Sequence, residues 1–347
     1  MTTLRLALLE DKVLLKHGAG GRAMRQLVRE VLTGGFPEGP AGLYGLDAMD
    51  DGAALPLGDG FLVITTDSHV VSPAFFAGGD IGRLAVSGTV NDLAMMGATE
   101  PLALTCAVVV EEGFSRADLE RIHASMVEAC REAGTTIVTG DTKVMGRGQL
   151  DGVMLNTTGI GMAARVVRDS GLRPGDRLIV SGSVGDHGCA VMAARHKLEL
   201  SGDLRSDVAP INALVRAALR AGGDGVVTLK DPTRGGLASA LHEMAEKSGV
   251  GIVLDEPSVP VTPAVRAASE LLGIDPLVIA NEGKALLGVR PHVAGAVLAA
   301  LRGQPQGQHA AIVGECVAER VGQVVLDTGF GRRLLVEIEG EPLPRIC

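Results

Sequence analysis

The order of its apolar segments restricts the folds open to this chain more than any other feature of the sequence. Short apolar runs predict strands near residues 61–66, 102–110, 135–140, 153–161, 178–181, 250–254 and 284–290. Longer amphipathic stretches predict helices near residues 16–32, 81–96, 115–134, 187–199, 209–221, 235–248 and 262–272. These strands and helices do not alternate regularly, as they would in a doubly wound parallel sheet. The pattern therefore predicts an α+β fold, and 347 residues suffice for about two domains.

Composition argues against several classes of protein. The net charge is −9 and the basic residues form no long run, so we expect no nucleic-acid partner. No apolar run reaches the roughly 18 residues of a membrane-spanning helix, and no signal segment opens the chain, so we expect no membrane association and a cytoplasmic location. The cysteines are widely spaced and odd in number, which argues against a disulfide scaffold and a structural zinc site.

The chain ends in a cysteine, Cys347, that follows Pro342 and Pro344. Proline continues neither a helix nor a sheet ladder, so we expect the two prolines to hold the last residues away from packed structure. A thiol on such a mobile arm can be carried to a distant site as a nucleophile. The alternative is an incidental surface cysteine.

Acidic residues in small-residue surroundings form the first candidate site. Its members are Asp51, Asp67, Asp92 and Asp141. Asp67 and Asp141 come directly after predicted strands, where a rigid sheet presents side chains to a ligand. Asp92 interrupts a predicted helix, although aspartate is a poor helix former. Hard oxygen ligands of this kind suit Mg²⁺ bound together with nucleotide phosphates. Any one of these aspartates can instead be a turn former.

A glycine-rich stretch before the first predicted helix forms the second candidate site. Gly18, Gly20 and Gly21 expose backbone N–H groups that can bind a phosphate. The same stretch fits a dinucleotide-binding pattern, but no strand of a βαβ unit precedes it, so we reject a Rossmann interpretation. A flexible turn is the remaining alternative.

Two further charged residues stand close to these motifs. Lys143 follows the Asp141 turn and could neutralise charge on a transferring phosphoryl group. Glu282 lies in the stretch 280–284 and could accept a proton. Both can also be ordinary solvated surface residues.

Together these motifs resemble the HypE family of carbamoyl dehydratases, which act in hydrogenase maturation. The matching stretches are His17–Gly21, Thr65–His69, Gly78–Gly82, Val90–Ala94, Thr139–Lys143, Ser181–Gly188, Asp231–Leu237, Ala280–Lys284 and Pro344–Cys347. The closing Pro-Arg-Ile-Cys is highly specific, whereas the glycine-rich and acidic stretches also resemble the wider aminoimidazole ribonucleotide synthetase superfamily. Ala77 stands where the family pattern leads us to expect proline, and we expect this difference to leave the reaction unaffected.

The resemblance implies a two-domain aminoimidazole ribonucleotide synthetase-like fold with a flexible C-terminal tail, in a homodimer that binds ATP and Mg²⁺. We expect an N-terminal segment with the glycine-rich stretch (1–40), an ATP-binding domain (41–165), a second α+β domain (166–336) and a mobile tail (337–347). The substrate would be an S-carboxamide on Cys347, supplied by the carbamoyltransferase HypF. ATP-dependent dehydration would turn it into an S-cyanide, and the cyanide would pass to the HypC–HypD complex.

The resemblance also implies roles for the candidate residues. Metal and nucleotide would be held by Asp51, Asp67, Asp92 and Asp141, with Gly18, Gly20 and Gly21 on the phosphates. The catalytic residues would be Cys347 as carrier, Lys143 as a cation that stabilises the transferred phosphoryl group or assists deprotonation, and Glu282 as general base. Two other readings stay open: another ATP-dependent kinase or synthetase of the superfamily, and a non-catalytic carrier.

Overall fold

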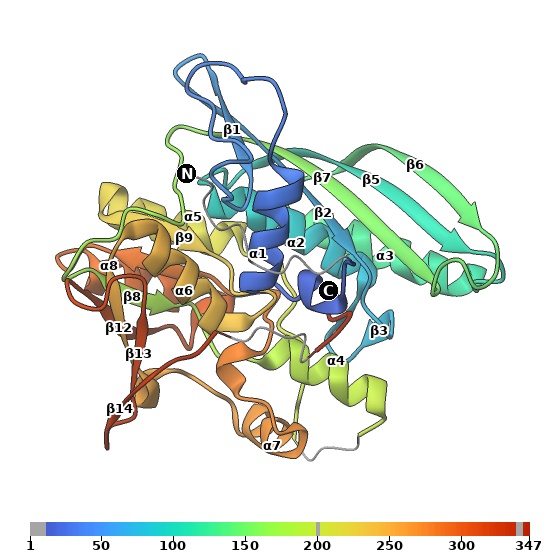
Figure 1. Cartoon of the computed structure of the whole chain (residues 1–347). Helices are drawn as coiled ribbons and strands as arrows, with labels where there is room; N and C mark the ends of the chain where they lie inside the picture. The colour runs from blue at the N-terminus through green and yellow to red at the C-terminus, as the bar shows by residue number, and fades with distance from the viewer. Residues whose placement is uncertain (1–11, 199–201, 338–342) are drawn as a thin grey trace, which may run out of the picture.

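The computed structural model describes residues 12–198, 202–337 and 343–347. Two α+β domains follow one another along the chain, each built on its own main sheet (Figure 1). The predicted α+β class is therefore confirmed. Among the described residues, none of the helices is both long and apolar enough to span a membrane.

The first domain contains a five-stranded sheet of order β1-β2-β7-β5-β6. Its strands are β1 (Ala53–Leu57), β2 (Gly60–His69), β5 (Pro101–Glu111), β6 (Ile137–Met145) and β7 (Val153–Ala163). All neighbouring strands are antiparallel except β5 and β6, which are parallel. A small two-stranded sheet joins β3 (Phe75–Phe76) to β4 (Gly79–Asp80).

Two helices of the first domain lie on one face of this sheet, α2 (Ile81–Met95) and α3 (Arg116–Ala133) (Figure 1). Both were predicted. The Asp80 side chain caps α2 by accepting hydrogen bonds from the backbone of its first turn. Ser115 caps α3 in the same way, and the left-handed Gly134 ends it. Helix α2 is buried along almost its whole length because the sheet covers one side and the second domain the other.

The second domain contains a seven-stranded sheet of order β14-β13-β10-β12-β8-β11-β9. Its strands are β8 (Arg177–Val180), β9 (Val226–Lys230), β10 (Gly251–Asp255), β11 (Leu286–Val289), β12 (Ala311–Val317), β13 (Val324–Asp327) and β14 (Arg332–Leu334). Its helices are α4 (Asp186–His196), α5 (Asn212–Gly222), α6 (Gly236–Ser248), α7 (Pro263–Leu272) and α8 (Ala294–Arg302).

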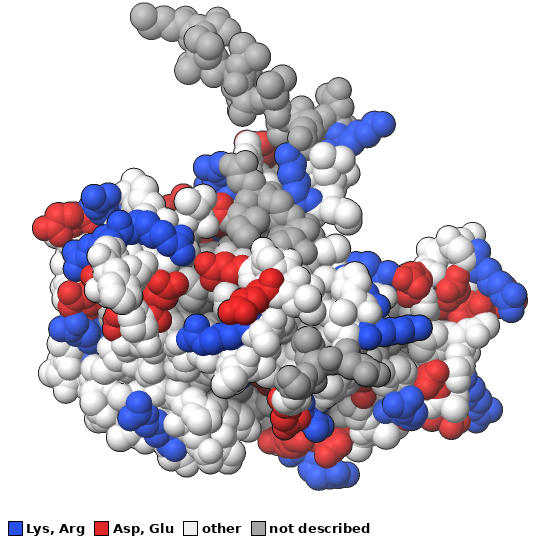
Figure 2. Space-filling model, turned by 90° about the horizontal axis from the view of Figure 1, so that it is seen from below, with Lys and Arg blue, Asp and Glu red and all other residues white. Residues whose placement is uncertain are grey.

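Short helical segments complete the fold. Before the first domain, η1 (Leu15–Gly18) leads into α1 (Arg22–Leu27) and the π-helical η2 (Val28–Leu32). The second domain adds η3 (Gly223–Gly225), η4 (Glu256–Ser258), η5 (Pro276–Val278) and η6 (Pro305–Gly307). On the face shown in Figure 2, basic and acidic side chains are interspersed.

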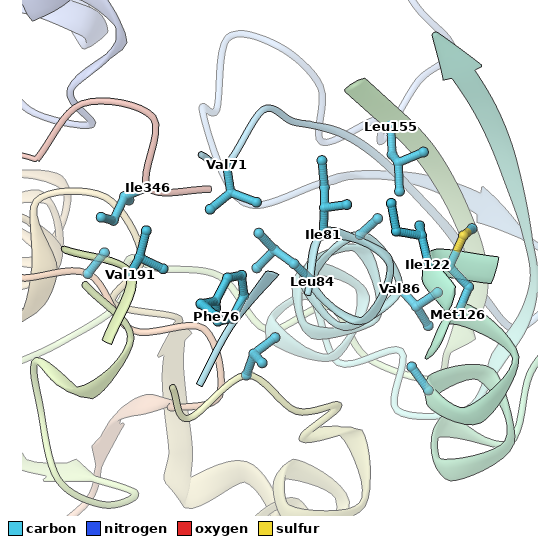
Figure 3. Close-up of a cluster of buried hydrophobic side chains, with 14 of the residues drawn as sticks. Val71, Phe76, Ile81, Leu84, Val86, Ile122, Met126, Leu155, Val191 and Ile346 are labelled. Atoms are coloured by element: carbon cyan, nitrogen blue, oxygen red, sulfur yellow. The ribbon is translucent and has the colours of Figure 1, made fainter. Parts of the chain in front are cut away.

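One hydrophobic cluster joins the two domains and the end of the chain. It contains side chains of α2, α3, α4 and α7, and Leu343 and Ile346 belong to it (Figure 3). Ile346 lies beside Val191 of α4 in this cluster. The C-terminus is therefore packed where the domains meet.

Candidate active site

A cavity of about 260 Å³ lies between the two domains. The first domain contributes Asp51, Asp67 and Asp92 to its wall, and the second contributes Lys230, Asp231 and Glu282. Gly20 closes one side before α1, and Cys347 lines the cavity as well. Residues from seven separate stretches of the sequence thus meet in one place.

Three acidic groups of this cavity have raised pKa values. Burial and the nearby carboxylates of Asp231 and Asp67 raise the pKa of Asp92 well above its usual range. Burial and Asp51 raise the pKa of Asp231 to about 8. Burial and Asp231 raise the pKa of Glu282 well above its usual range. Crowded carboxylates of this kind favour a cation or a proton among them, so the cavity is suited to a positively charged ligand.

A buried lysine partly compensates this negative charge. The Lys230 ammonium lies 2.8 Å from Asp51, 3.2 Å from Glu243 and 3.5 Å from Asp169. Burial alone would lower its pKa, but these carboxylates raise the pKa of Lys230 well above its usual range. Arg25 of α1 reaches the same group through Glu243, at 3.0 Å. The glycine-rich segment is thereby attached to the wall of the cavity.

The loop that carries Glu282 is fixed by a buried aspartate. The Asp207 carboxylate accepts hydrogen bonds from the backbone N–H groups of Glu282 and Gly283, at 3.2 and 3.0 Å. Lys284 donates to it as well, at 3.0 Å. The Oε1 atom of Glu282 is buried and has no hydrogen-bond partner within the described part of the chain. An unsatisfied carboxylate oxygen in a cavity wall is suited to a proton or an N–H group of a ligand.

The end of the chain lies inward, with Cys347 against the cavity. An oxygen of its terminal carboxylate accepts a hydrogen bond from the Val70 N–H, at 3.1 Å, and the Arg345 carbonyl accepts from the Ser72 N–H, at 3.2 Å. Arg195 also donates to the Arg345 carbonyl, at 2.8 Å. These contacts tie the last residues to both domains.

The inward position differs from the expectation that the two prolines hold the last residues away from packed structure. Leu343 and Ile346 are buried, because each enters the hydrophobic cluster between the domains. Arg345 adopts a left-handed conformation (φ 55°) between them, which turns the chain toward the cavity. Residues 343–347 therefore take the inward position in this structure, and the mobility predicted for residues 337–347 stays a prediction, since residues 338–342 lie outside the described residues.

The other predicted site residues divide into two groups. Asp51, Asp67, Asp92, Glu282, Gly20 and Cys347 line the cavity. Gly18 and Gly21 flank Gly20 but are not part of the wall. A side chain at Gly20, which has a φ of +81°, would collide with the Arg234 backbone, so the glycine permits this close approach.

Asp141 and Lys143 lie away from the cavity of their own chain. The strand predicted to end before Asp141 continues to Met145, because Thr142 and Val144 extend the parallel pairing with β5. Asp141 and Lys143 are therefore exposed mid-strand residues that pair with each other at 2.6 Å. Asp67 likewise lies within β2 and not after it, but its side chain still reaches the cavity.

Lys230, Asp231 and Glu243 line the cavity but were not among the predicted site residues. Asp231 directly follows β9, the same position relative to a strand that drew attention to Asp67. That strand was not predicted because its apolar run is short and ends in a lysine. Only the ion pairs of Lys230 in the folded chain make its burial possible.

The donor set fits Mg²⁺ held together with phosphates. Mg²⁺ is usually bound through one or two carboxylates, waters and substrate phosphates rather than by a closed cage of protein ligands. In the described ranges no three acidic, histidine or cysteine side chains are grouped closely enough to hold a metal ion by themselves. The crowded carboxylates therefore suit a metal that arrives with a nucleotide.

Comparison with known families matches both domains. Residues 49–163 match the sequence model of the AIR synthase related protein, N-terminal domain, and residues 173–327 match that of the C-terminal domain. The predicted two-domain fold of this type is thereby confirmed.

Individual proteins match over nearly the whole chain. Carbamoyl dehydratase HypE of Rhizobium leguminosarum bv. viciae is 48% identical over 99% of this chain and 97% of its own. A crystal structure of hydrogenase maturation protein HypE in complex with ATP is 44% identical, with a TM-score of 0.80, and covers 97% of this chain and 100% of its own. HypE from a HypE–HypF complex is 42% identical, with a TM-score of 0.83, over 90% of this chain and 99% of its own.

Proposed function

The chain belongs to the family of carbamoyl dehydratase HypE, and on this premise we propose that it dehydrates an S-carboxamide on its own Cys347 to an S-cyanide at the expense of ATP. The product supplies cyanide for the maturation of nickel-iron hydrogenase. One observation carries this proposal beyond the similarity of sequence: Cys347 lines the cavity that also holds the crowded carboxylates. An incidental surface cysteine would not be expected to line this cavity.

The chemistry requires activation of the amide oxygen, which is a poor leaving group. The amide oxygen attacks the γ-phosphorus of ATP, the bond from that phosphorus to the bridging oxygen breaks, and one N–H proton is lost. The C–O bond then breaks, phosphate leaves, and loss of the second N–H proton completes the C≡N bond. ADP, phosphate and the S-cyanide are the products. Positioning and charge stabilisation supply most of the acceleration in such phosphoryl transfers.

Glu282 is the proposed general base. Its Oε1 atom has no hydrogen-bond partner in the described part of the chain. Because Glu282 lines the cavity, this oxygen can accept a proton from an N–H group of the carboxamide. Burial and the neighbouring Asp231 raise the pKa of Glu282, so its ionised form is a stronger proton acceptor than an exposed glutamate.

The nucleotide site is proposed from the same cavity. Asp51, Asp67 and Asp92 would hold Mg²⁺ together with the phosphates, and Asp231, which shares the wall, would assist them. When bound, Mg²⁺ would neutralise the phosphates and polarise the transferred group. Gly18, Gly20 and Gly21 are proposed to contact phosphate, which the wall position of Gly20 supports.

We propose further that two chains form a homodimer through β6. All residues from Val138 to Val144 are exposed, and the apolar side chains of these two valines are 62% and 69% exposed. A strand left open on both faces is suited to a second protein surface. Asp141 and Lys143 lie on this strand, so we place their proposed roles, metal ligand and cation near the phosphoryl group, in a site shared across the dimer.

The partners follow from the same reaction. HypF would deliver the carbamoyl group to Cys347, and the HypC–HypD complex would accept the cyanide. Both transfers require Cys347 to leave the cavity and return. The cytoplasm, where ATP is available and thiols stay reduced, is the proposed location.

Intact-protein mass spectrometry tests this function. The chain is incubated with HypF, carbamoyl phosphate and MgATP, and the terminal peptide should gain a carbamoyl group and then lose the mass of one water. The loss should require ATP and be absent from a Cys347→Ala variant. Hydrolysis of ATP without any modification of the tail would instead indicate a small-molecule kinase or synthetase, and carbamoylation without the later loss would indicate a carrier.

A further inference from the structure

A buried histidine at the start of α4 contacts the last peptide group of the chain. His187 is fully buried, and its Nε2 atom lies 2.7 Å from the carbonyl oxygen of Ile346. Its Nδ1 atom lies 2.8 Å from the hydroxyl oxygen of Ser206. Phe76 packs its ring against the imidazole edge, with centroids 5.3 Å apart. The ring is therefore held on three sides.

The direction of these hydrogen bonds can be assigned from their chemistry. A carbonyl oxygen only accepts, so Nε2 must carry the proton and donate to Ile346. Burial lowers the pKa of His187, so the ring is neutral and Nδ1 accepts from the Ser206 hydroxyl. The Ser206 oxygen in turn accepts from the Val208 N–H, at 3.1 Å. The chain of donors thus runs in one direction, from Val208 to the peptide group beside Cys347.

The same short segment also fixes the proposed base. Asp207, between Ser206 and Val208, accepts the backbone hydrogen bonds of Glu282 and Gly283. The Ser206 N–H donates to the Ala77 carbonyl, at 2.8 Å, which ties the segment to the first domain. One three-residue segment therefore sets both the position of Glu282 and, through His187, that of the thiol-bearing residue.

We propose that His187 is the positioning residue that holds carbamoylated Cys347 in register with the phosphoryl donor and Glu282, and that Ser206 selects the tautomer required for this. The proposal rests on the proposed dehydratase function. His187 is not part of the cavity wall, so it acts through the Ile346 carbonyl and touches neither ATP nor the reacting atoms. A misplacement of about 1 Å at the reacting centre costs roughly 100-fold in rate, so a single well-placed donor can have a large effect.

Two amide variants of His187 form a matched pair for the test. The side-chain nitrogen of glutamine lies near the place of Nε2, whereas that of asparagine lies near the place of Nδ1. His187→Gln should therefore keep the bond to Ile346, and His187→Asn should lose it. In single-turnover experiments on fully carbamoylated protein, we expect His187→Asn to slow water loss by about 100-fold and His187→Gln to stay within about tenfold of wild type, with ATP affinity unchanged in both.

A second measurement tests the tail without the chemistry. Carboxypeptidase should cleave Cys347 from unmodified His187→Asn faster than from wild type or His187→Gln, because the carboxypeptidase acts only on a C-terminus that has left the cavity. If wild-type protein fails to lose water, the dehydratase function is wrong, and the release rates alone then decide the role of His187.

Equal rates for both variants, whether as fast as wild type or equally slow, overturn the proposal, since a donor at Nε2 would then have no special role. If His187→Asn does not fold, Ser206→Ala decides. This variant should release Cys347 faster and dehydrate more slowly, each by about threefold to tenfold, the effect of one neutral hydrogen bond. Unchanged rates in Ser206→Ala also overturn the proposal.

Discussion

Truncation of Ile346 should shift the tail from the inward to the outward position. The side chain is only 3% exposed and packs in the cluster between the domains. Each buried methylene contributes about 0.8 kcal/mol, so Ile346→Val should weaken docking by about 0.8 kcal/mol and Ile346→Ala by about 2.4 kcal/mol. These values are lower bounds, because a cavity under the shortened side chain adds to the cost. The ratio of outward to inward tails should rise by about fourfold and about fiftyfold.

A bulky maleimide measures this ratio, because it reaches Cys347 only when the tail is outward. The other cysteines are buried, so peptide mass spectrometry can assign the reaction to Cys347. The labelling rate should increase from wild type to Ile346→Val to Ile346→Ala in the stated proportions. Val336→Ala is the matched control, since this residue is 72% exposed and its truncation should change nothing. Equal labelling rates in all four proteins would refute an inward tail held by Ile346.

Three further predictions concern the cavity and the proposed dimer. Glu282→Gln should slow water loss by at least about 100-fold in single-turnover mass spectrometry, with carbamoylation by HypF unchanged; a wild-type rate would exclude Glu282 as the base. Asp231 has its pKa raised to about 8, so the folded chain keeps a proton that the unfolded chain loses, and the free energy of unfolding should fall as the pH rises from about 4 to 8. Asp231→Asn should flatten this slope in urea titrations of nucleotide-free protein, and an unaltered slope would mean that Asp231 is not its source. Val144→Glu should dissociate the proposed dimer in sedimentation experiments, whereas Val321→Glu, at a similarly exposed site of the second domain, should not; two dimeric variants would place the interface elsewhere, and a monomeric wild-type protein would refute the dimer itself.

Local patterns sufficed for much of the fold. Helix α3 was predicted with its ends, because Ser115 and Gly134 are strong local signals for a start and a stop, and helix α2 was predicted from its apolar periodicity. Strand β9 was missed, since Lys230 is compatible with a buried strand only after three carboxylates from distant segments surround it. Such long-range compensation leaves no local pattern.

The candidate site shows the same limit. An aspartate that follows an apolar run was predicted to face a ligand. This is consistent with Asp67, which lines the cavity, but Asp141 lies on an exposed strand away from it. Both lie within longer strands than predicted, and only the packing of the whole chain distinguishes them. The apolar spacing of Leu343 and Ile346 was a local signal for a docked tail, and the neighbouring prolines obscured it.

The fate of the amide oxygen tests the central claim most directly. HypF is supplied with carbamoyl phosphate whose carbonyl oxygen is oxygen-18, and the carbamoylated chain is then given unlabelled MgATP. Activation of the amide oxygen by ATP predicts that the label appears in the released phosphate, in proportion to the S-cyanide formed on Cys347. Label found in water, with unlabelled phosphate, would contradict this account of the reaction.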